Sequence, residues 1–555
     1  MISVMAIWLY MLLTCYVTGF ACIRAIAGKN RLREWNGVDY LYTGVAAVTV
    51  YAQIFSIFAG VGLVANFVLL FICGWCIWIC RRELPEQLYA FRQTFTLGKA
   101  IVALLLFVLF AYGASRGIIH YDTGLYHAQS IRWIEELGVV PGLGNLHSRL
   151  AYNSSAFCLS ALYSMAFLGG QSYHCCAGFL AFLLALVCTQ AFYRRRPARP
   201  LLSDFARVIA VYYLLNVFDE MVSPASDYFM VLLVFYIVIR WLELTEREEN
   251  SYLPYAVLCI MCVCVLTVKL SGALLLLLTL KPAVMMIREN RIKDILKFLC
   301  LGITTVLPFL ARNVILSGWL VYPFTAIDLF NFDFKIPKGM ADYDAREIQV
   351  WGRGLKDVAA YDDPVWQWLP QWIRGLDNTD KLFLVLAASG VLILLFLILY
   401  TIVWRRWELL SFLHIVGTLS ACFLFWLLSA PLIRYGCVFL WLTPVLIWGW
   451  IYLRCSPRVD RYKLCIALLV IVGIYKLGVF GLETGRTASA DYLVFQKDYE
   501  NFETVAYELS GYTFYYPAEG DRTGYEDFPA SPQRASEEIL RSEYIRDGFR
   551  AAGGG

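Results

Sequence analysis

Long apolar stretches recur along the whole chain and are separated by short polar or basic links. A helix needs ~20 mostly apolar residues to cross the hydrocarbon core of a bilayer. The pattern therefore predicts an all-α polytopic membrane protein with about fourteen transmembrane helices. We expect these spans near residues 4–25, 38–58, 61–80, 99–117, 172–193, 204–218, 226–243, 252–267, 270–287, 294–312, 382–403, 408–428, 433–452 and 463–481.

Basic residues cluster in the links and set the predicted orientation. Positively charged loops stay on the cytoplasmic side of a membrane. With the N-terminus outside, every short basic link is cytoplasmic, provided that residues 153–168 do not span. We therefore predict that this apolar segment lies in the interface as an amphipathic helix. The basic clusters are Lys29/Arg31/Arg33, Arg81/Arg82, Arg194/Arg195/Arg196, Arg288/Arg291/Lys293, Arg405/Arg406 and Arg454/Arg458/Arg461.

The spans divide the chain into three predicted parts. Residues 1–97 form an N-terminal three-span extension, and residues 98–481 form the transmembrane core with outer loops 118–171 and 313–381. The hydrophilic residues 482–555 form a small extracytoplasmic tail. Proline and glycine turn signals leave two possibilities for the tail, an ordered appendage or a semi-disordered arm.

The composition agrees with a chain embedded in lipid. Hydrophobic residues make up 60% of the 555 residues and charged residues 16%, whereas soluble domains are about 45–50% apolar and about 25% charged. The net charge of +4 is small and scattered, so no nucleic-acid partner is expected. Most of the 17 cysteines lie in apolar stretches without metal-like spacing, which indicates neither a disulfide framework nor a zinc site. The chain has no internal repeat or Walker motif, which argues against an ATP-driven pump.

Residues 117–155 carry the densest set of polar groups next to a predicted span. Asp122 follows the fourth span by about one helical turn, and we expect a surface helix from Gly124 to Leu137 that Gly138 closes. A polar constellation at a membrane surface is a candidate functional site. The alternative is that these groups only solvate an interfacial loop and cap its helix. The polar members are Asp122, Tyr126, His127, His147, Arg149 and Asn153.

Further ionisable residues lie at the edges of predicted spans. One short outer link carries the carboxylates Asp219, Glu220 and Asp227. Lys269 lies within an apolar pair of spans, where an unpaired cation costs ~2.5–3.5 kcal/mol, and Asp227 is a candidate to compensate its charge. Arg312 and Arg434 end or begin spans and fall, with Lys269, on the outer side near one depth. Such cations could bind a lipid-linked phosphate, whereas a lone cation at a helix end is more simply a snorkelling anchor.

The outer loop 313–381 is rich in tryptophan and in carboxylates. Tryptophan stacks on sugar rings but also marks the membrane interface, and we favour the interface for most of these residues. We expect the carboxylates to form a solvated surface. The residues concerned are Trp319, Trp351, Trp366, Trp368, Trp372, Asp342, Asp344, Asp362 and Asp363.

The order of these motifs resembles the GT-C superfamily of membrane glycosyltransferases, which includes protein O-mannosyltransferases and lipid A aminoarabinose transferases. The likeness covers residues 98–481 and rests on HYDTGLYH, NSSAFCLSALY…FYRRR, LTVKLSGALLLLL, ARNVILSGWLVYPF and PLIRYG. YDTGLYHAQSIRWIEELGVVPGLGNLH and LVYPFTAIDLFNFDFKIP look like a bacterial family of uncharacterised multi-spanning membrane proteins. Two features depart from the superfamily pattern. Three spans precede the expected first one, and the Asp122 loop lacks the DE or DD pair of many members, although Asp219–Glu220 could supply a second acidic point.

The resemblance implies an inverting glycosyltransferase of the bacterial cytoplasmic membrane with an active site that faces outside. Its donor would be a polyprenyl-phosphate sugar, and its acceptor a glycan, lipid or protein. Asp122 would be the general base, and Lys269, Arg312 and Arg434 would bind the donor phosphate. The acceptor would be positioned by Tyr126, His127, His147, Arg149, Asn153, Asp219, Glu220 and Asp227. The leaving phosphate is already an anion, so no general acid is required. No metal ligands are identified, although a divalent ion such as Mg or Mn stays open.

Two other classes of function remain as alternatives. A transporter or flippase of lipid-linked saccharides could use the same cations as a phosphate pathway, but such proteins show repeats or broken spans in corresponding halves. An O-antigen polymerase or ligase also has outer loops and arginines, but it would not need an acidic residue directly after a span. The sequence leaves the sugar, the lipid length, the acceptor and the oligomeric state open.

Overall fold

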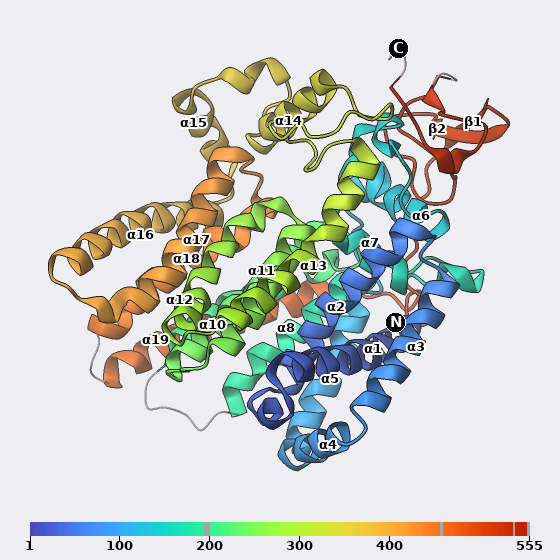
Figure 1. The fold of residues 1–555 in the computed structure, drawn as a ribbon. Helices are drawn as coiled ribbons and strands as arrows, with labels where there is room; N and C mark the ends of the chain where they lie inside the picture. The colour runs from blue at the N-terminus through green and yellow to red at the C-terminus, as the bar shows by residue number, and fades with distance from the viewer. Residues whose placement is uncertain (194–199, 456–458, 537–538, 552–555) are drawn as a thin grey trace.

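The computed structural model describes residues 1–193, 200–455, 459–536 and 539–551. Its helices form one bundle, and a small β hairpin lies beside the C-terminus at one end (Figure 1). The helices of the first half are α1 (Ile2–Ala27), α2 (Gly37–Phe58), α3 (Leu63–Ile79), α4 (Glu83–Thr94), α5 (Leu97–Gly113), α6 (Ala128–Glu136), α7 (Ser155–Tyr163), α8 (Cys176–Tyr193), α9 (Leu202–Asn216) and α10 (Ser226–Glu246). The second half contains α11 (Tyr252–Val268), α12 (Leu280–Arg288), α13 (Ile292–Ser317), α14 (Lys338–Gly352), α15 (Val365–Gly375), α16 (Asn378–Val403), α17 (Leu410–Ser429), α18 (Ile433–Cys455), α19 (Val459–Arg486), β1 (Thr504–Leu509) and β2 (Tyr512–Pro517).

Within the described ranges, eight helices are long and apolar enough to cross a membrane, or nine if the bent pair α3–α4 is one span. The expectation of a helical membrane protein with several spans is therefore confirmed. Every span predicted from the sequence coincides with a helix, but α5, α8, α9 and α11 are short, and the predicted count is not established. The eight helices are Ile2–Ala27, Gly37–Phe58, Ser226–Glu246, Leu270–Arg288, Ile292–Ser317, Asn378–Val403, Trp407–Ser429 and Ile433–Cys455.

The two ends of the bundle carry different groups. At the end that we call the tail end, the Met1 ammonium group donates a hydrogen bond to the carbonyl oxygen of Tyr492 over 2.6 Å. At the opposite end, Glu83 pairs with both Arg24 and Lys29. The predicted basic residues Arg194, Arg195, Arg196 and Arg458 lie outside the described residues.

The three N-terminal helices pack into the same hydrophobic core as α5, α7, α8 and α10. The α1–α2 pair is especially close, because its contact is made through glycines. A Cβ atom on Gly19 would lie 1.8 Å from the carbonyl oxygen of Tyr40, and one on Gly44 would lie 1.7 Å from that of Cys15. Small residues permit such close backbone approach between membrane helices. The predicted N-terminal extension is thus packed as part of the bundle.

A buried network of charges joins three helices at the opposite end. Arg240 on α10 pairs with Asp39 on α2 over 2.8 Å and with Glu243 over 3.0 Å. Arg207 on α9 also pairs with Glu243 and reaches Asp204 over 2.8 Å. Buried ions are tolerated when they are paired in this way. The network therefore links α2, α9 and α10 at the end of the bundle opposite the tail.

Helix α7 corrects the prediction of an amphipathic interfacial helix at residues 153–168. The nine residues of α7 are buried on every side, and its neighbours are α2, α6, α8, α10 and α11. It does not form a complete span, because nine residues at 1.5 Å per residue reach less than half of the hydrocarbon core. The segment is apolar because protein surrounds it.

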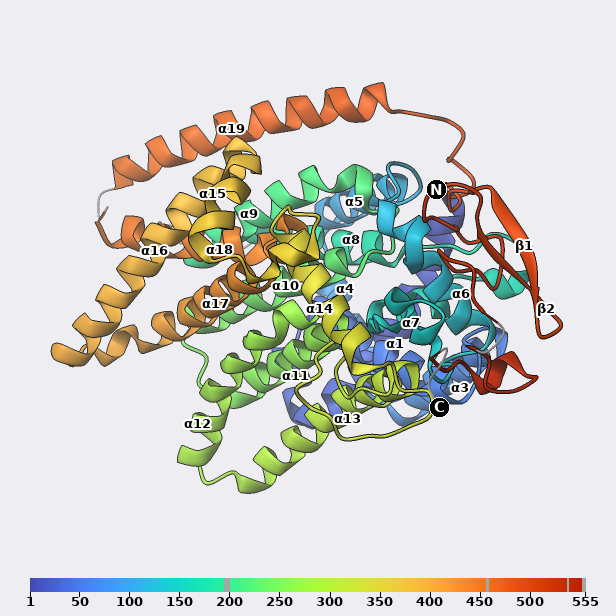
Figure 2. The same cartoon turned by 90° about the horizontal axis from the view of Figure 1, so that it is seen from above.

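The described residues of the tail include a β hairpin that packs on the bundle. Strands β1 and β2 form an antiparallel hairpin with Leu509 opposite Tyr512. The connecting Ser510 and Gly511 both have positive φ, as a two-residue hairpin turn requires. In Figure 2, α19 runs along the edge of the bundle and leads to this hairpin. Hairpin residues such as Phe514 share a hydrophobic cluster with Trp133 of α6.

The tail also corrects the prediction of a surface helix at 124–137. This segment begins as one turn of π-helix, Thr123–His127, and continues as α6. Its polar face is covered by the tail. The Gln129 amide donates to the carbonyl oxygens of Gly524 and Asp527, and Arg132 donates to that of Tyr525. The predicted ending at Gly138 is correct, with φ of 80°.

Candidate functional site

Four charged side chains from four separate segments meet at the tail end of the bundle. Arg434 donates a hydrogen bond to Asp122 over 2.5 Å, and its Nε lies 3.7 Å from Oδ2 of Asp227. The ammonium group of Lys269 forms an ion pair with the same Asp227. Asp122 precedes α6, Asp227 begins α10, Lys269 follows α11, and Arg434 begins α18. We call these four residues the charge cluster.

Lys269 is positioned by a break between two helical segments. Its backbone is extended, with φ of −156° and ψ of 131°, and ends α11. A ten-residue 3₁₀ helix, Leu270–Thr279, follows, although 3₁₀ runs beyond three or four residues are uncommon. The Lys269 ammonium lies 3.6 Å from the centre of the Tyr435 ring, a cation–π distance. The break therefore holds the cation between a carboxylate and an aromatic face.

Arg434 is positioned by a kink at the start of α18. Gly436 departs from helical geometry there, and a Cβ atom on it would lie 2.4 Å from the Trp426 ring. Trp426 in turn donates a hydrogen bond to the carbonyl oxygen of Leu432 over 2.9 Å. The lack of a side chain at Gly436 lets the chain turn around Trp426, and this turn directs Arg434 toward Asp122.

The loop that carries Asp122 is tied to the link before α10. Gly117 has a φ of 112°, and a Cβ atom on it would lie 2.0 Å from the carbonyl oxygen of Asp219, so this close approach requires glycine. The backbone N–H of His120 donates to Ser223 Oγ over 2.7 Å. The Asp122 N–H donates to Nδ1 of His120 over 3.1 Å. These contacts place the acid next to the start of α10.

The charges of the cluster balance, and its carboxylates and cations are mostly shielded from solvent. The side-chain exposure is 8% for Asp227, 17% for Asp122, 20% for Lys269 and 26% for Arg434. Burial raises the pKa of Asp122, but the Arg434 charge and hydrogen bond, together with the adjacent His127 and His120, outweigh it and leave that pKa below its usual value. Burial and the Arg434 charge lower the pKa of His120. Asp122 is therefore ionised and His120 neutral at pH 7.

The comparisons with known proteins give one result for this chain. A family profile described as "Domain of unknown function (DUF8201)" matches residues 1–441. The chain belongs to the DUF8201 family. The DUF8201 region contains the whole charge cluster and the three N-terminal helices, and it ends within α18 before the tail. None of the curated proteins and none of the solved structures matches the chain.

Two of the predicted acceptor-positioning residues of the DUF8201 region lie beside the cluster but have their own partners. Asp219 pairs with the buried Arg116 over 3.0 Å. Glu220 accepts a hydrogen bond from the Tyr228 hydroxyl over 2.6 Å. Both carboxylates thereby fix the link between α9 and α10, which carries Asp227.

Tyr126 and His127 follow Asp122 on the π-helical turn and are enclosed by aromatic rings. The His127 ring lies 4.4 Å from Tyr126 and 5.3 Å from Phe157, between ring centres. Its Nδ1 lies 3.2 Å from the Thr123 hydroxyl. Burial lowers the pKa of His127 to about 3, so this histidine is neutral. Both residues lie next to Asp122 on the same turn.

The structure does not bring His147, Arg149 and Asn153 to Asp122 by any hydrogen bond or ion pair among the described residues. His147 Nδ1 accepts from the Arg149 N–H over 3.3 Å and caps a short 3₁₀ helix. The Arg149 guanidinium reaches Glu347 of α14 over 3.4 Å. Asn153 donates to the carbonyl oxygen of Phe309 over 2.9 Å. These residues connect the 118–171 loop to α13 and α14 instead.

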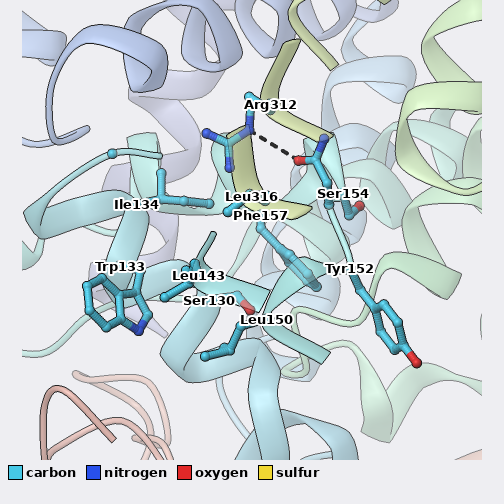
Figure 3. Close-up of a pocket in the computed structure, with 12 residues that line it drawn as sticks. Ser130, Trp133, Ile134, Leu143, Leu150, Tyr152, Ser154, Phe157, Arg312 and Leu316 are labelled. Carbon is cyan, nitrogen blue, oxygen red and sulfur yellow. Dashed lines mark hydrogen bonds between the residues drawn. The ribbon is translucent and has the colours of Figure 1, made fainter. Parts of the chain in front are cut away.

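Arg312 is buried and is held by polar side chains of two other segments. Its Nε donates to Asn153 over 3.1 Å and a terminal nitrogen donates to Ser56 over 2.5 Å. Figure 3 shows Arg312 and Ser154 above a cavity of about 10 Å³, with Ser130 and Trp133 on its far side. A cavity of this volume holds about one water molecule. The described partners of Arg312 are Asn153 and Ser56, whereas Lys269 and Arg434 pair with carboxylates of the charge cluster, and a role of Arg312 at the donor phosphate stays a prediction.

The loop 313–381 departs from its predicted surface character. Trp319, Trp368 and Trp372 are buried, whereas Trp351 and Trp366 are exposed. Asp344 is also buried, at 3% exposure, and accepts hydrogen bonds from Tyr152 over 2.8 Å and Ser148 over 3.2 Å. The interface interpretation is wrong for the three buried tryptophans, because α14 and α15 pack on the bundle. The solvated-surface interpretation is wrong for Asp344.

Two residues of the site had no predicted role, although His120 belongs to the polar segment 117–155. His120 lies against Arg434, with Nδ1 2.9 Å from a terminal nitrogen, and Tyr435 lies beneath the Lys269 ammonium. The sequence offered one signal for them: His120 lies two residues before Asp122, and Tyr435 directly follows Arg434. No group of three or more metal-binding side chains occurs among the residues that the structure describes.

Proposed function

We propose that this protein is a membrane glycosyltransferase that moves a sugar from a polyprenyl-phosphate donor to a glycan, lipid or protein acceptor. The charge cluster carries the proposal, because a chain of ion pairs links Asp122 to Arg434, Arg434 to Asp227, and Asp227 to Lys269 at one end of apolar helices. A sugar-phosphate donor needs cations for the phosphate and a base for the acceptor hydroxyl. Lys269, Arg434 and Asp122 supply these two functions.

The proposed reaction is a single displacement with inversion. The acceptor oxygen forms a bond to the anomeric carbon, and the bond from that carbon to the phosphate oxygen breaks. Asp122 takes the proton of the acceptor hydroxyl. The electron pair of the broken bond stays on the phosphate oxygen, where Lys269 and Arg434 stabilise the added charge. Holding donor and acceptor in line contributes several further kcal/mol to catalysis.

The resting contacts give the reaction an order. Arg434 hydrogen-bonds Asp122 directly, so a donor phosphate that binds Arg434 competes with this carboxylate. Once Arg434 is shared with the phosphate, Asp122 loses part of the interaction that lowers its pKa and becomes a stronger base. Donor binding would thereby activate the base for the acceptor. Before the donor binds, Asp227 compensates the positive charge of Lys269.

The finer features of the membrane arrangement belong to the same proposal. We propose fourteen spans, with the N-terminus, the loop 313–381 and the tail on the outer face of a bacterial cytoplasmic membrane. The support is that Met1 contacts the tail and that Arg24 and Lys29 lie at the other end of the bundle. Basic residues at one end agree with a cytoplasmic position.

A proteoliposome assay tests the proposed function. The purified protein is supplied with a polyprenyl-phosphate sugar, with and without candidate acceptors, and donor consumption is followed. We expect acceptor-dependent loss of donor that Asp122→Asn abolishes. Movement of the intact donor across the bilayer without consumption would instead identify a flippase, and joining of preformed glycans would identify a polymerase or ligase. Addition of EDTA in the same assay tests the possible Mg or Mn requirement.

A further inference from the structure

A second hollow of the molecule lies away from the charge cluster, along α14. It has a volume of about 500 Å³ and opens to the surface. One wall is formed by the segment 323–326 and the other by α14, with Tyr361 at the end of the groove. We call this hollow the α14 groove. Its volume falls within the ~300–1,000 Å³ of ordinary small-ligand sites.

The α14 wall presents a row of polar side chains. Lys338, Asp342, Arg346 and Gln349 recur at intervals of three or four residues and so share one face of the helix. Among the described residues, Lys338, Arg346 and Gln349 make no side-chain hydrogen bond or ion pair, whereas Asp342 accepts one bond from Thr325 over 2.5 Å. The groove therefore offers both free donors and a carboxylate acceptor.

The end of the groove is aromatic and held in place. The Arg346 guanidinium stacks over the Tyr361 ring, 5.2 Å from its centre. The buried Arg353 donates a hydrogen bond to the carbonyl oxygen of Tyr361 over 2.8 Å and so fixes this turn against the end of α14. Phe324 on the opposite wall is 53% exposed. Aromatic faces next to polar side chains match the alternating C–H and O–H surfaces of a sugar ring.

A series of neighbouring tilted and edge-to-face rings runs from the groove to the proposed transfer site. Tyr322, next to the groove wall, lies 6.1 Å from Tyr152, and Tyr152 lies 5.7 Å from Tyr126. Tyr126 lies 4.4 Å from His127 on the turn that carries Asp122. The same Tyr152 holds Asp344 of α14. Three ring-to-ring contacts thus lead from the edge of the groove to His127, next to the proposed base.

We propose that the α14 groove binds the sugar units of a glycan chain, which makes a glycan the acceptor class. That the bound glycan is the acceptor rests on the proposed function, whereas glycan binding in the groove does not. Sugar hydroxyls both donate and accept, so they satisfy Lys338, Gln349 and Asp342 together. A phosphate headgroup only accepts, so it could pair with Lys338 and Arg346 but would give the Asp342 carboxylate no donor. The mixed lining therefore favours a glycan over an anionic lipid.

Saturation-transfer NMR on the full chain in nanodiscs tests this proposal. The probes are chitotetraose and maltotetraose, with inorganic phosphate as competitor. We expect saturation of the ring protons of at least one tetrasaccharide, reduced at least fivefold in Tyr361→Ala and in Arg346→Ala. Tyr361→Phe keeps the ring and should keep the signal. Tyr343→Ala, which changes an exposed residue of α14 outside the groove, should match the wild type.

Three results would overturn the proposal. These are no saturation of either tetrasaccharide, an unchanged signal in Tyr361→Ala, and displacement of the sugar by phosphate in the wild type but not in Lys338→Ala. The last would assign the groove to an anion such as a lipid headgroup. Asp122→Asn should bind the sugar normally. Sugar binding without any transferase activity would reject the proposed function and leave the groove assignment intact.

Discussion

Arg434 and Asp122 are separated by 312 positions in the chain and are joined by a hydrogen bond of 2.5 Å from the guanidinium to Oδ2 of the carboxylate. Both side chains are mostly shielded from water, with exposures of 26% and 17%. A charge-assisted bond of this kind is stronger than a neutral one. It keeps Asp122 ionised before any substrate arrives, and it occupies one of the two cations that a phosphate would need.

Asp122→Asn tests the assigned base. Asparagine keeps the size of the side chain but cannot accept the proton, so transfer should fall by ~10²–10⁴ while donor binding persists. The measurement is turnover per folded molecule, with folded yield from size-exclusion chromatography. Asp521→Asn is the matched control, since Asp521 bonds only the nearby Tyr121 hydroxyl in the described structure. If Asp122 served only the loop structure, yield would fall and turnover per folded molecule would not.

Neutralising the two cations should weaken donor binding. Arg434→Ala or Lys269→Ala removes a hydrogen bond to a charged group, worth ~1.5–3 kcal/mol, and should raise the donor KM or lower turnover accordingly. Arg434→Lys should restore only part, because the planar fork is lost. Arg454→Ala, at the other end of α18, is the control and should leave the donor KM unchanged. Wild-type donor kinetics in Arg434→Ala would make this residue an anchor instead.

The competition between phosphate and Asp122 for Arg434 has a signature in the pH dependence. Asp122 works as a base only above its own pKa, which Arg434 and the neighbouring histidines hold low against the effect of burial. The acid limb of the pH profile of kcat/KM reports the pKa of Asp122 in the free enzyme. The acid limb of the kcat profile reports its pKa in the donor complex. We therefore expect the kcat limb at a higher pH than the kcat/KM limb. Coincident limbs would show that donor binding leaves the Asp122–Arg434 pair unchanged.

Glu135 of α6 should make docking of the tail sensitive to pH. Its carboxylate accepts hydrogen bonds from Tyr525 over 2.5 Å and from Ser172 over 2.9 Å, and burial raises its pKa from 4.5 to about 7. The folded protein holds a proton that the unfolded chain loses in this window, so stability should fall as the pH rises from 4.5 to about 7.

Thermal unfolding across this range measures the Glu135 effect. Glu135→Gln is always neutral, so its Tm should lose most of this pH dependence, with a difference from wild type of a few degrees at most. Glu136→Gln changes the exposed neighbour and should behave like the wild type. A Glu135→Gln protein with the full wild-type pH dependence would show that another group is responsible.

The membrane arrangement can be tested with single introduced cysteines in a chain cleared of its exposed native ones. Labels at 340 and 520 should react from one side of the membrane, and a label at 290 from the other. The reason is that the tail contacts Met1 and the 118–171 loop, whereas Arg24 and Glu83 pair at the opposite end. Labelling of 290 and 340 from the same side would invalidate the topology and the site built on it.

The amino-acid sequence alone predicts a helical membrane protein, because the length of a hydrophobic run depends on no contact between distant segments. It also singled out Asp122, Lys269 and Arg434, since a charge next to an apolar helix is costly wherever it folds. It predicted the Gly138 ending of α6, because only glycine readily adopts positive φ there.

Which of these residues contact one another could be seen only in the folded chain. The partners of the charge cluster lie on segments separated by long spans, and no sequence pattern fixes which helix ends touch. The tertiary structure also supplied the partners of Arg312, because Asn153 and Ser56 of other segments hold its guanidinium. It buried the polar face of α6, because that face packs against a tail whose strands are more than 300 residues further along the chain. Periodicity reports whether a face is apolar, whereas burial of a polar face depends on which distant segment supplies its hydrogen bonds.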